Sequence, residues 1–336
     1  MITPKPSVSK LQPYSPPIES RGEFIRLDFN ENLINRGKFS GVDVSVYPEY
    51  AELIKKLSSY FGVKRENILP TNGADEAIKT VVDTFVDKGD EVMIIEPTFP
   101  MFRLYAQIAG AKIKSIPYSR DFSFPVDKVL ENISKKTKLI VIANPNNPTG
   151  TLLEIDDVIR ILNKGKNSAV LIDEAYADFS GVSCIGLIPK YRNLIVAKSF
   201  SKVFGLAGLR LGALVSDEGN IKWLKKVRSP YSVNSMAVKI GIAALNDPGH
   251  AKKYVLEIKK NKRMLAGYLR ELGIDVYEGH ANFLLAGFSK PDKLYNFLKK
   301  RGILIRRIPL KGFVRITIGA KKQMQYLMKC MGDYVE

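Results

Sequence analysis

Lys202 ends the segment Ser199-Phe-Ser-Lys202, which follows the short apolar run from Leu194 to Ala197. Such a run predicts a buried strand, so the lysine would lie just beyond a strand end. Burial disfavours the charged form of an amine and lowers its pKa toward neutrality. A neutral amine is a nucleophile that forms a Schiff base with an aldehyde. The hydroxyl of Ser199 and the guanidinium of Arg210 would offer donors suited to a nearby phosphate.

A single Ser-x-x-Lys motif also occurs by chance in solvated loops. Other polar or aromatic side chains, however, follow further apolar runs in this chain. Phe99 comes shortly after Ile95, Asn147 follows the run that ends at Ala143, and Asp173 and Tyr176 follow Ile172. These strand ends would supply an aromatic ring, an amide, a carboxylate with a phenol, and an amine. A buried aspartate needs a cationic or hydrogen-bonding partner, because an unpaired buried charge is costly.

The segment Asn72-Gly-Ala-Asp-Glu76 precedes a predicted helix over residues 76–86. Small residues at the start of a helix expose backbone N–H groups, and the helix dipole adds positive potential there. Gly73, Ala74 and Asp75 are therefore candidates for binding a phosphate. An ordinary helix cap would have the same composition.

The elements that must position these residues alternate between strands and helices. The predicted strands are continuous in Val, Ile and Leu, which is typical of strands covered on both faces. They span residues 92–95, 112–116, 139–143, 169–172, 194–197 and 211–215. This pattern predicts an α/β fold, in which a mostly parallel sheet has helices on both faces. Ligands of such sheets bind beyond the carboxyl ends of the strands, where the candidate residues fall.

The last part of the chain has a different pattern, which predicts a smaller α+β domain. A long helix over residues 247–272 comes first, with further helices over 291–301 and 321–334. Short strands are predicted over 274–277, 282–286, 303–307 and 313–318. We therefore expect a large domain over residues 40–245, and a smaller unit made of residues 1–39 and 246–336. Arg306 and Arg315 lie in these strands, where an isolated arginine usually takes the exposed face.

The composition limits the classes of protein. The 336 residues are 45% hydrophobic, and the formal net charge is +18. The basic residues are dispersed and have no interleaved aromatic run, so we expect a basic solvated surface that attracts anionic substrates rather than nucleic acid. No apolar run reaches membrane-spanning length, and the N-terminus has no apolar signal core. Cys184 and Cys330 form no metal or redox pattern. We expect a cytoplasmic protein without a metal site.

Taken together, the motifs resemble those of the fold-type I pyridoxal-phosphate enzymes, the class I and II aminotransferases. The resemblance covers nearly the whole chain, with the motifs in the same order. It is carried by Asn-Gly-Ala-Asp-Glu, Pro-Thr-Phe, Asn-Pro-Asn-Asn-Pro-Thr-Gly, Asp-Glu-Ala-Tyr, Ser-x-Ser-Lys and Gly-Leu-Arg-x-Gly.

The resemblance implies a role for each matching residue. Lys202 would hold pyridoxal 5'-phosphate covalently and act as general base and acid. Asp173 would pair with the ring nitrogen and keep it protonated. Tyr176 and Asn147 would bind the phenolic oxygen of the ring, and Phe99 would stack on its face. The phosphate would be held by Gly73, Ala74, Asp75, Ser199 and Arg210.

Two further matches concern a neighbouring subunit and the substrate. Tyr47 matches a tyrosine that reaches the phosphate from the partner in a homodimer, so the site would be complete only in the dimer. Arg315 matches the arginine that binds the substrate carboxylate or its equivalent.

Within that class, the chain looks most like the histidinol-phosphate aminotransferases. In that family, the residues that match Tyr14, Arg306 and Arg315 line the substrate site, and two arginines could grip a phosphate monoester. The amino acceptor and donor would be 2-oxoglutarate and glutamate. The alternatives are a threonine-phosphate decarboxylase of the same fold, an aminotransferase for aromatic or other amino acids, and a binding protein that has lost catalysis. Retention of Lys202 and Asp173 argues against the last.

Overall fold

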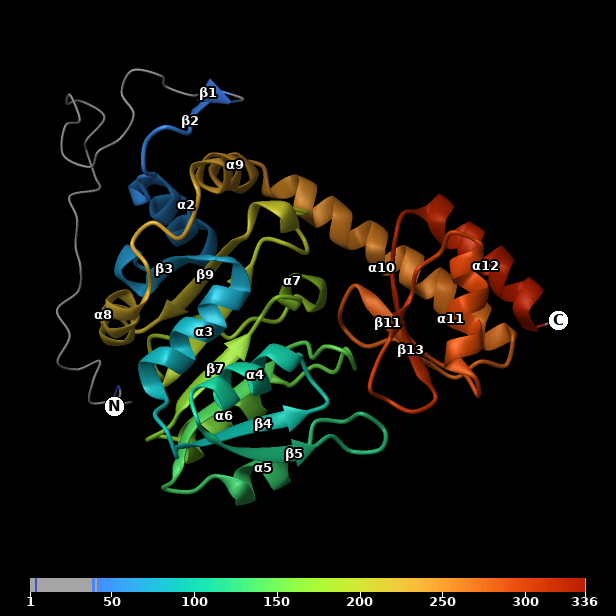
Figure 1. The fold of residues 1–336 in the computed structure, drawn as a ribbon, viewed down its shortest axis with the longest axis horizontal. Helices are drawn as coiled ribbons and strands as arrows, with labels where there is room; N and C mark the ends of the chain where they lie inside the picture. Colours follow the sequence, from blue (N-terminus) through green and yellow to red (C-terminus); the bar gives the residue numbers. More distant parts are fainter. Residues whose placement is uncertain (1–3, 5–37, 40, 336) are drawn as a thin grey trace.

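The computed structural model describes residue 4, residues 38–39 and residues 41–335 of the chain. Its main layer is a seven-stranded sheet in the order β3-β9-β8-β7-β6-β4-β5 (Figure 1). Every strand is parallel to the rest except β9, which runs antiparallel to both of its neighbours. The strands are β3 (Ile68–Asn72), β4 (Glu91–Glu96), β5 (Lys112–Pro117), β6 (Thr137–Ala143), β7 (Ala169–Asp173), β8 (Leu194–Ser199) and β9 (Leu211–Ser216).

Both faces of the inner strands of this sheet are covered, which is why these strands are apolar at successive positions. The edge strand β5 differs from the expectation of a strand covered on both faces, because only Ile116 of its six residues is buried. Neighbouring residues in β4 show the alternation, since Met93 packs into the core on one face and Ile94 into the core on the other. The Ile94 side is covered by α3 (Gly73–Phe85), α4 (Pro100–Ile108) and α8 (Glu218–Val227). The Met93 side is covered by α5 (Val126–Asn132) and α6 (Ile155–Lys164).

A third group of helices packs beside β3 and β9. It consists of α2 (Ala51–Phe61) and α9 (Ser235–Asn246), whose residues Leu53 and Ala237 share a buried cluster with Ile68 and Leu211. The short hairpin of β1 (Lys38–Phe39) and β2 (Val42–Asp43) contacts α9. The helix α7 (Ala177–Ser180) follows β7.

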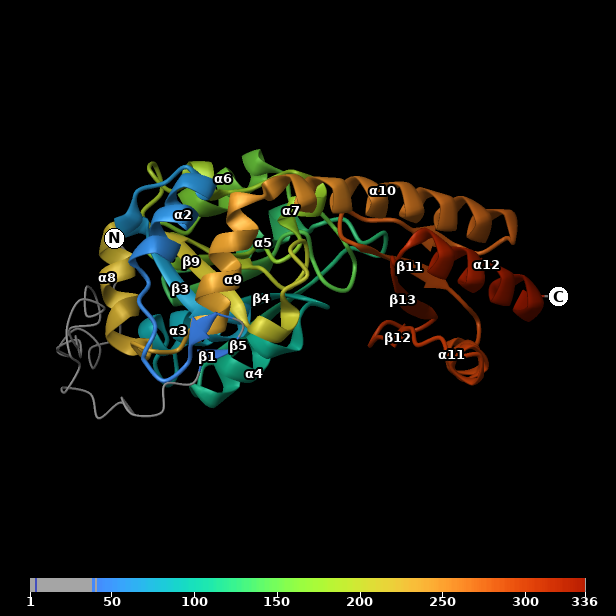
Figure 2. The ribbon, with the colours of Figure 1, turned by 90° about the horizontal axis from the view of Figure 1, so that it is seen from above.

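The remaining elements form a second layer, which we call the C-terminal module (residues 248–335). The long helix α10 (Pro248–Glu271) leads into it from the main sheet (Figures 1 and 2). Its antiparallel sheet has the order β10-β11-β13-β12. The elements are β10 (Val276–Tyr277), β11 (Phe283–Gly287), α11 (Pro291–Lys300), β12 (Arg306–Arg307), β13 (Phe313–Thr317) and α12 (Lys321–Val335).

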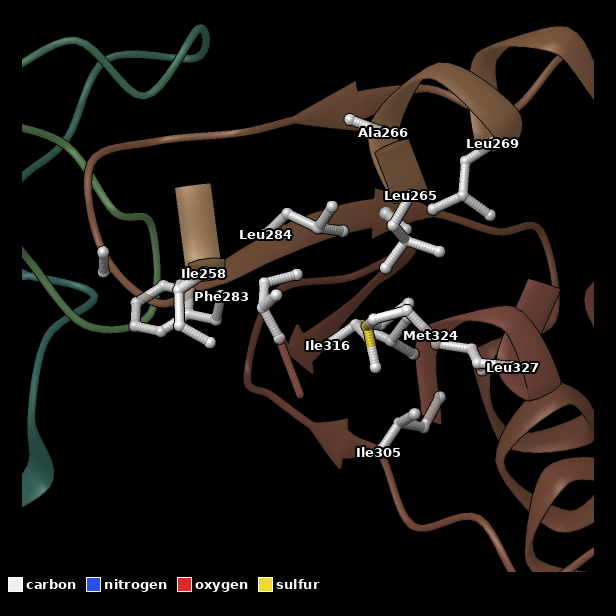
Figure 3. Packing of buried hydrophobic residues seen from close by; sticks show 14 of the residues in the cluster. Ile258, Leu265, Ala266, Leu269, Phe283, Leu284, Ile305, Ile316, Met324 and Leu327 are labelled. Carbon is white, nitrogen blue, oxygen red and sulfur yellow. The ribbon is translucent and has the colours of Figure 1, made fainter. Parts of the chain in front are cut away.

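The core of the C-terminal module lies between its sheet and its helices. Leu265 of α10, Leu284 and Ile316 of the sheet, and Met324 of α12 pack together there (Figure 3). The same cluster includes Tyr176 from the segment after β7. The two layers thus share apolar contacts, and we retain a boundary near residue 246 between two domains as a proposal.

The predicted fold class is confirmed, because the sheet is mostly parallel and lies between helices. Two strands of the C-terminal module are shorter than expected, and β3 was not among the expected strands. β10 covers only Val276–Tyr277 of the expected 274–277. Only the first two residues of β3, Ile68 and Leu69, are apolar, and the strand extends to Asn72 because all five of its residues pair with β9. β12 covers only Arg306–Arg307 of the expected 303–307. Among the described residues, no helix has the length and apolarity needed to cross a membrane.

Candidate active site

The predicted residues converge on one cavity of about 420 Å³ between the two layers. Its floor is formed by the ends of β6, β7 and β8 and by the start of α3, and the β12–β13 region closes its opposite side. Eleven of the predicted site residues line it: Ala74, Asp75, Phe99, Asn147, Asp173, Tyr176, Ser199, Lys202, Arg210, Arg306 and Arg315.

Lys202 lies three residues beyond β8, half-buried at the centre of this group. Its Nζ is 5.5 Å from the centroid of the Tyr176 ring. Burial, together with the positive charge of Arg315, lowers the pKa of Lys202 below the usual value for a lysine. Asp173 and Asp75 act in the opposite direction but do not cancel the shift. The amine is therefore neutral, and nucleophilic, in a larger fraction of molecules than a surface lysine would be.

Asp173 is the last residue of β7, and its side chain is buried in the cavity floor. The Ala175 backbone N–H donates to its Oδ1 at 3.0 Å. Burial raises the pKa of Asp173 from 3.8 to about 6 despite that hydrogen bond. A buried carboxylate of this kind gains most from a cationic partner, so the floor of the cavity favours a ligand with a protonated nitrogen.

The end of the cavity at α3 is shaped for an anion. Gly73 begins that helix with a φ of +76°, and a Cβ placed on it would lie 2.6 Å from Nη2 of Arg210. Arg210 donates from Nη2 to Asp75 Oδ2 at 2.7 Å. Ser199 ends β8 on the same side. Backbone N–H groups at the helix start, a hydroxyl and a guanidinium together form a phosphate-binding arrangement.

Phe99, Tyr176 and Asn147 lie between the anion end and the C-terminal module. The Phe99 ring is held edge-on against Phe102 with the centroids 5.8 Å apart. Burial raises the pKa of Tyr176 to about 12, so its phenol stays protonated and can donate a hydrogen bond. Oδ1 of Asn147 accepts a hydrogen bond from Nη1 of Arg315. An aromatic face and a phenol donor are thus available to a planar ligand.

The two predicted arginines enter the cavity from paired strands. Arg306 of β12 lies opposite Arg315 of β13 in the strand register. Arg306 is exposed, whereas Arg315 is half-buried, with its guanidinium 5.0 Å from the Phe283 ring centroid. Nε of Arg315 is buried and has no hydrogen-bond partner among the described residues. Arg315 therefore departs from the usual exposed position of a strand arginine, and it faces the space that Lys202 also faces.

Two of the predicted residues that the structure describes, Gly73 and Tyr47, do not line this cavity. Gly73 borders it only through its contact with Arg210. Tyr47 is 42% exposed and stacks on Tyr231 with ring centroids 4.1 Å apart, beside α9. Its own chain does not bring Tyr47 to Lys202. Tyr14 lies outside the residues that the structure describes.

The structure also places in the cavity residues that were not among the predicted site residues, such as Thr98, Ser201 and Arg307. Arg307 is ion-paired with Asp292 at 3.1 Å. Successive residues in a strand point to opposite faces, so sequence alone would assign only one of two neighbouring arginines to the site. β12 is only two residues long, and both of its arginines reach the cavity.

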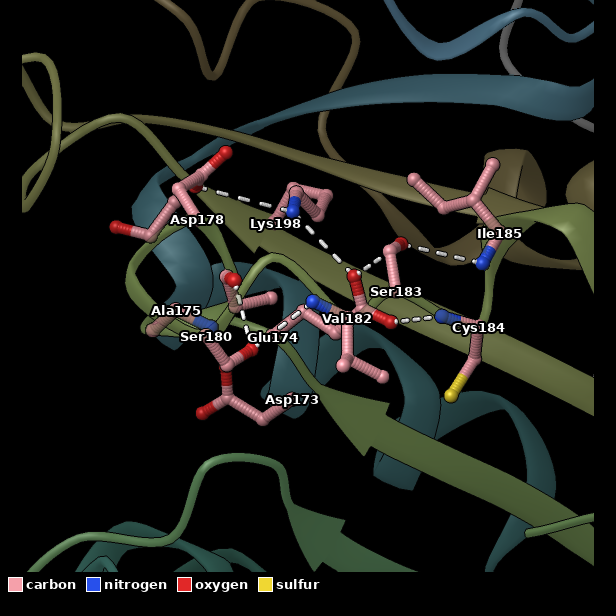
Figure 4. A network of polar contacts seen from close by, with 12 residues as sticks. Asp173, Glu174, Ala175, Asp178, Ser180, Val182, Ser183, Cys184, Ile185 and Lys198 are labelled. Atoms are coloured by element: carbon pink, nitrogen blue, oxygen red, sulfur yellow. Dashed lines mark hydrogen bonds and ion pairs between the residues drawn. The ribbon is translucent and has the colours of Figure 1, made fainter. Parts of the chain in front are cut away.

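A buried polar network lies beside Asp173, at the ends of β7 and β8 (Figure 4). Nζ of Lys198 in β8 is 3.3 Å from Glu174 Oε2, and both side chains are almost fully buried. Ser183 Oγ donates to Glu174 Oε2 at 2.6 Å, and the Cys184 backbone N–H donates to Oε1 at 2.5 Å. Glu174 follows Asp173, and Lys198 precedes Ser199. The network therefore ties together the ends of the two strands that carry these site residues.

Comparison with known proteins shows the same architecture. A family model described as aminotransferase class I and II matches residues 24–330. A histidinol-phosphate aminotransferase of Caldanaerobacter subterraneus subsp. tengcongensis is 36% identical over 300 residues, which cover 87% of this chain and 85% of that protein.

Two solved structures extend the comparison. The histidinol-phosphate aminotransferase of Clostridium acetobutylicum superimposes with a TM-score of 0.81 at 27% identity, covering 87% of this chain and 91% of that one. The enzyme of the same name from Sinorhizobium meliloti, solved with pyridoxal-5'-phosphate, has a TM-score of 0.81 at 23% identity and covers 87% of this chain and 84% of that one. At that identity the second comparison concerns the fold alone.

Proposed function

The chain belongs to the class I and II aminotransferases and is a pyridoxal-phosphate-dependent transaminase, and from this premise we propose that it transaminates histidinol phosphate with 2-oxoglutarate. The supporting observation is the placement of Arg306 and Arg315 on paired strands at the side of the cavity away from the anion end. Two guanidiniums there suit a second phosphate, carried by the substrate. The relatives named above carry the same activity in their names.

The cavity fits the cofactor on three observations. The buried Asp173, whose pKa is raised, would pair with the protonated ring nitrogen. Gly73, Ser199 and Arg210 would hold its phosphate. Because Gly73 has no Cβ, the guanidinium of Arg210 can lie against the start of α3, where a Cβ would collide with it. Lys202 has the lowered pKa that covalent attachment through Nζ requires. When bound, the cofactor supplies an aldehyde and a ring that accepts electrons.

We propose separate roles in the reaction for the side chains that line the cavity. Nζ of Lys202 would take the proton from the substrate carbon that bears the amino group, and it would return a proton to the cofactor carbon bonded to the same nitrogen. Only the neutral amine can accept a proton, because an ammonium has no free electron pair. The Tyr176 phenol and the Asn147 amide would orient the ring through its oxygen. Arg315, half-buried beside Lys202, would fix the substrate anion and exclude water from that side.

We further propose that the working form is a cytoplasmic homodimer, with glutamate as the amino donor. Tyr47 supports the dimer, since it is exposed and lies away from the cavity of its own chain. Its phenol would reach the cofactor phosphate of a second subunit if the active sites of the two subunits face each other. Both cysteines are free and buried, in keeping with a reducing compartment.

The deciding experiment is a single-turnover assay of the protein loaded with pyridoxal phosphate. We expect histidinol phosphate and glutamate each to convert the cofactor absorbance rapidly, whereas phenylalanine and aspartate convert it slowly. Release of carbon dioxide from threonine phosphate would instead assign the decarboxylase activity. Rapid conversion by phenylalanine, with none by histidinol phosphate, would assign an aromatic aminotransferase.

A variant of Arg306 distinguishes binding of the substrate phosphate from binding of substrates in general. Arg306→Ala should raise the KM for histidinol phosphate about 10- to 100-fold, because a charge-assisted pair is lost, and change the KM for glutamate much less. Arg263→Ala, at an exposed arginine on α10, is the matched control and should change neither. Equal increases for both substrates would contradict a phosphate role for Arg306.

A further inference from the structure

Lys262 is a buried lysine of α10 that does not line the cavity around Lys202. Its Nζ donates to the backbone carbonyls of Gly279 at 2.8 Å and of Ala281 at 2.9 Å. Burial lowers the pKa of Lys262 to about 8, because a charged ammonium is less stable in a buried position than in water. The two hydrogen bonds offset part of that cost. The lysine therefore holds the turn of residues 279–281 against α10.

This turn is where the C-terminal module contacts the segment that carries Asn147. The His280 backbone N–H donates to the Gly150 carbonyl at 2.7 Å. Gly150 and Gly279 both have a positive φ, and a Cβ placed on Gly279 would lie 2.7 Å from Gly150 Cα. Two backbones approach this closely only because both residues are glycine. The contact is thus specific to this pair and tolerates little displacement.

Both partners of the contact lead directly to the site. On one side, Gly150 comes three residues after Asn147, whose Oδ1 accepts a hydrogen bond from Arg315. On the other, Ala281 leads into β11, in which Leu285 pairs with Arg315 of β13. The position of Arg315 relative to Asn147 therefore depends on where the 279–281 turn meets Gly150.

We propose that Lys262 is a positioning residue, which holds the 279–281 turn against Gly150 and so sets the place of Arg315 opposite Lys202. Lys262 touches neither cofactor nor substrate. Its effect falls mainly on the side of the cavity that binds the substrate anion, because the cofactor residues Asp173, Ser199 and Arg210 belong to the main layer and lie away from the Gly150 contact, with Asn147 as the one cofactor residue near it. The inference rests on the transaminase reaction and on the role proposed for Arg315, and is independent of the phosphorylated substrate.

The first test compares Lys262→Met with Lys260→Met, which removes the same charge from an exposed position on the same helix. In the cofactor-free protein, the His280 amide should exchange with deuterium about tenfold faster in Lys262→Met, because the turn that carries this donor is no longer held against Gly150. Lys260→Met should exchange like the unmodified protein. Unchanged exchange in Lys262→Met would overturn the proposal.

The second test separates substrate binding from cofactor binding. Lys262→Met should keep the Kd for pyridoxal phosphate within about twofold, while the single-turnover kcat/KM for glutamate falls about 10- to 100-fold, since a small misplacement of Arg315 is enough. Lys262→Arg should restore most of this loss. A parallel loss of cofactor affinity would overturn the proposal and assign Lys262 a role in the whole fold.

Gly279→Ala tests the same contact with the lysine intact, and Gly273→Ala controls for backbone strain. Both glycines have a positive φ, but no atom lies within 4 Å of a Cβ on Gly273. We expect the glutamate defect in Gly279→Ala and not in Gly273→Ala, and equal behaviour would overturn the inference. Because glutamate is the probe, failure with histidinol phosphate would count against the proposed substrate alone. If glutamate itself does not react, the exchange of His280 still decides.

Discussion

At the scale of single residues, two groups with opposite pKa shifts define the chemistry of the cavity. Burial raises the pKa of Asp173 and lowers that of Lys202, so each is driven toward its neutral form when the cofactor is absent. A ligand that brings a cationic nitrogen to Asp173 and an aldehyde to Lys202 relieves both penalties at once. The two residues are thus matched to one bound molecule rather than to each other.

The stability of the cofactor-free protein should depend on pH through Asp173. The Asp173 pKa of about 6 in the folded protein exceeds its ordinary 3.8, so the folded state holds this proton more tightly than the unfolded chain. Stability of the cofactor-free protein should therefore fall as the pH rises from about 4 to about 6, and stay lower above that. Asp173→Asn, which cannot ionise, should stabilise this form by about 3 kcal/mol at pH 8 and about half as much at pH 5.

Urea unfolding of the cofactor-free protein at the two pH values measures this difference. The same variant should bind pyridoxal phosphate more weakly than the unmodified protein, since the partner that we propose for the ring nitrogen has lost its charge. A gain in stability that is equal at pH 5 and pH 8 would mean that Asp173 does not titrate in this range.

At the scale of elements, the start of α3 is shaped by the close approach of Gly73 to Arg210. Gly73→Ala should weaken binding of pyridoxal phosphate at least about tenfold, because the new Cβ displaces the guanidinium and strains the backbone. Gly89→Ala is the matched control. That glycine also has a positive φ, but no atom lies within 4 Å of its Cβ position. Fluorescence titration of the two variants distinguishes a lost anion site from strain alone.

The ends of β7 and β8 depend on the buried pair Glu174–Lys198. Glu174→Gln leaves the buried ammonium of Lys198 with only its longer ion pair to Asp178 at 3.9 Å, so it should lower the free energy of unfolding by about 3 kcal/mol. Glu218→Gln, which breaks an exposed helical pair with Lys222, should cost less than about 1 kcal/mol. Chemical denaturation measures both, and similar losses would show that the buried network does not hold these strands together.

At the scale of the whole molecule, a shared site predicts complementation between two defective chains. Lys202→Ala and Tyr47→Ala should each have little activity at limiting cofactor. In a mixed dimer, one site combines Lys202 of one chain with the intact Tyr47 of the other. Refolding the two variants together should therefore restore up to about a quarter of the unmodified activity, from the statistics of random pairing. Activity no higher than the sum of the separate variants would contradict a shared site.

Local rules of sequence account for the main layer and for the floor of its cavity. Continuous Val, Ile and Leu in β6, β7 and β8 predict strands covered on both faces, and the carboxyl ends of parallel strands meet at one edge. The convergence of Asn147, Asp173 and Lys202 follows from that rule alone. The resemblance to class I and II aminotransferases rests on the same segments and is confirmed.

Tertiary packing decided the substrate side of the cavity, which no local sequence pattern predicts. Strand alternation assigns a face to Arg315 but does not say that this face meets a cavity, and a two-residue strand admits both Arg306 and Arg307. The contact of Gly150 with Gly279, and the hold of Lys262 on the adjoining turn, join segments far apart in the chain. The sequence therefore determined which side chains meet at the proposed cofactor site, because these side chains lie at the ends of individual strands that local patterns predict. The packing of the two layers determined the substrate side, because it depends on contacts between them.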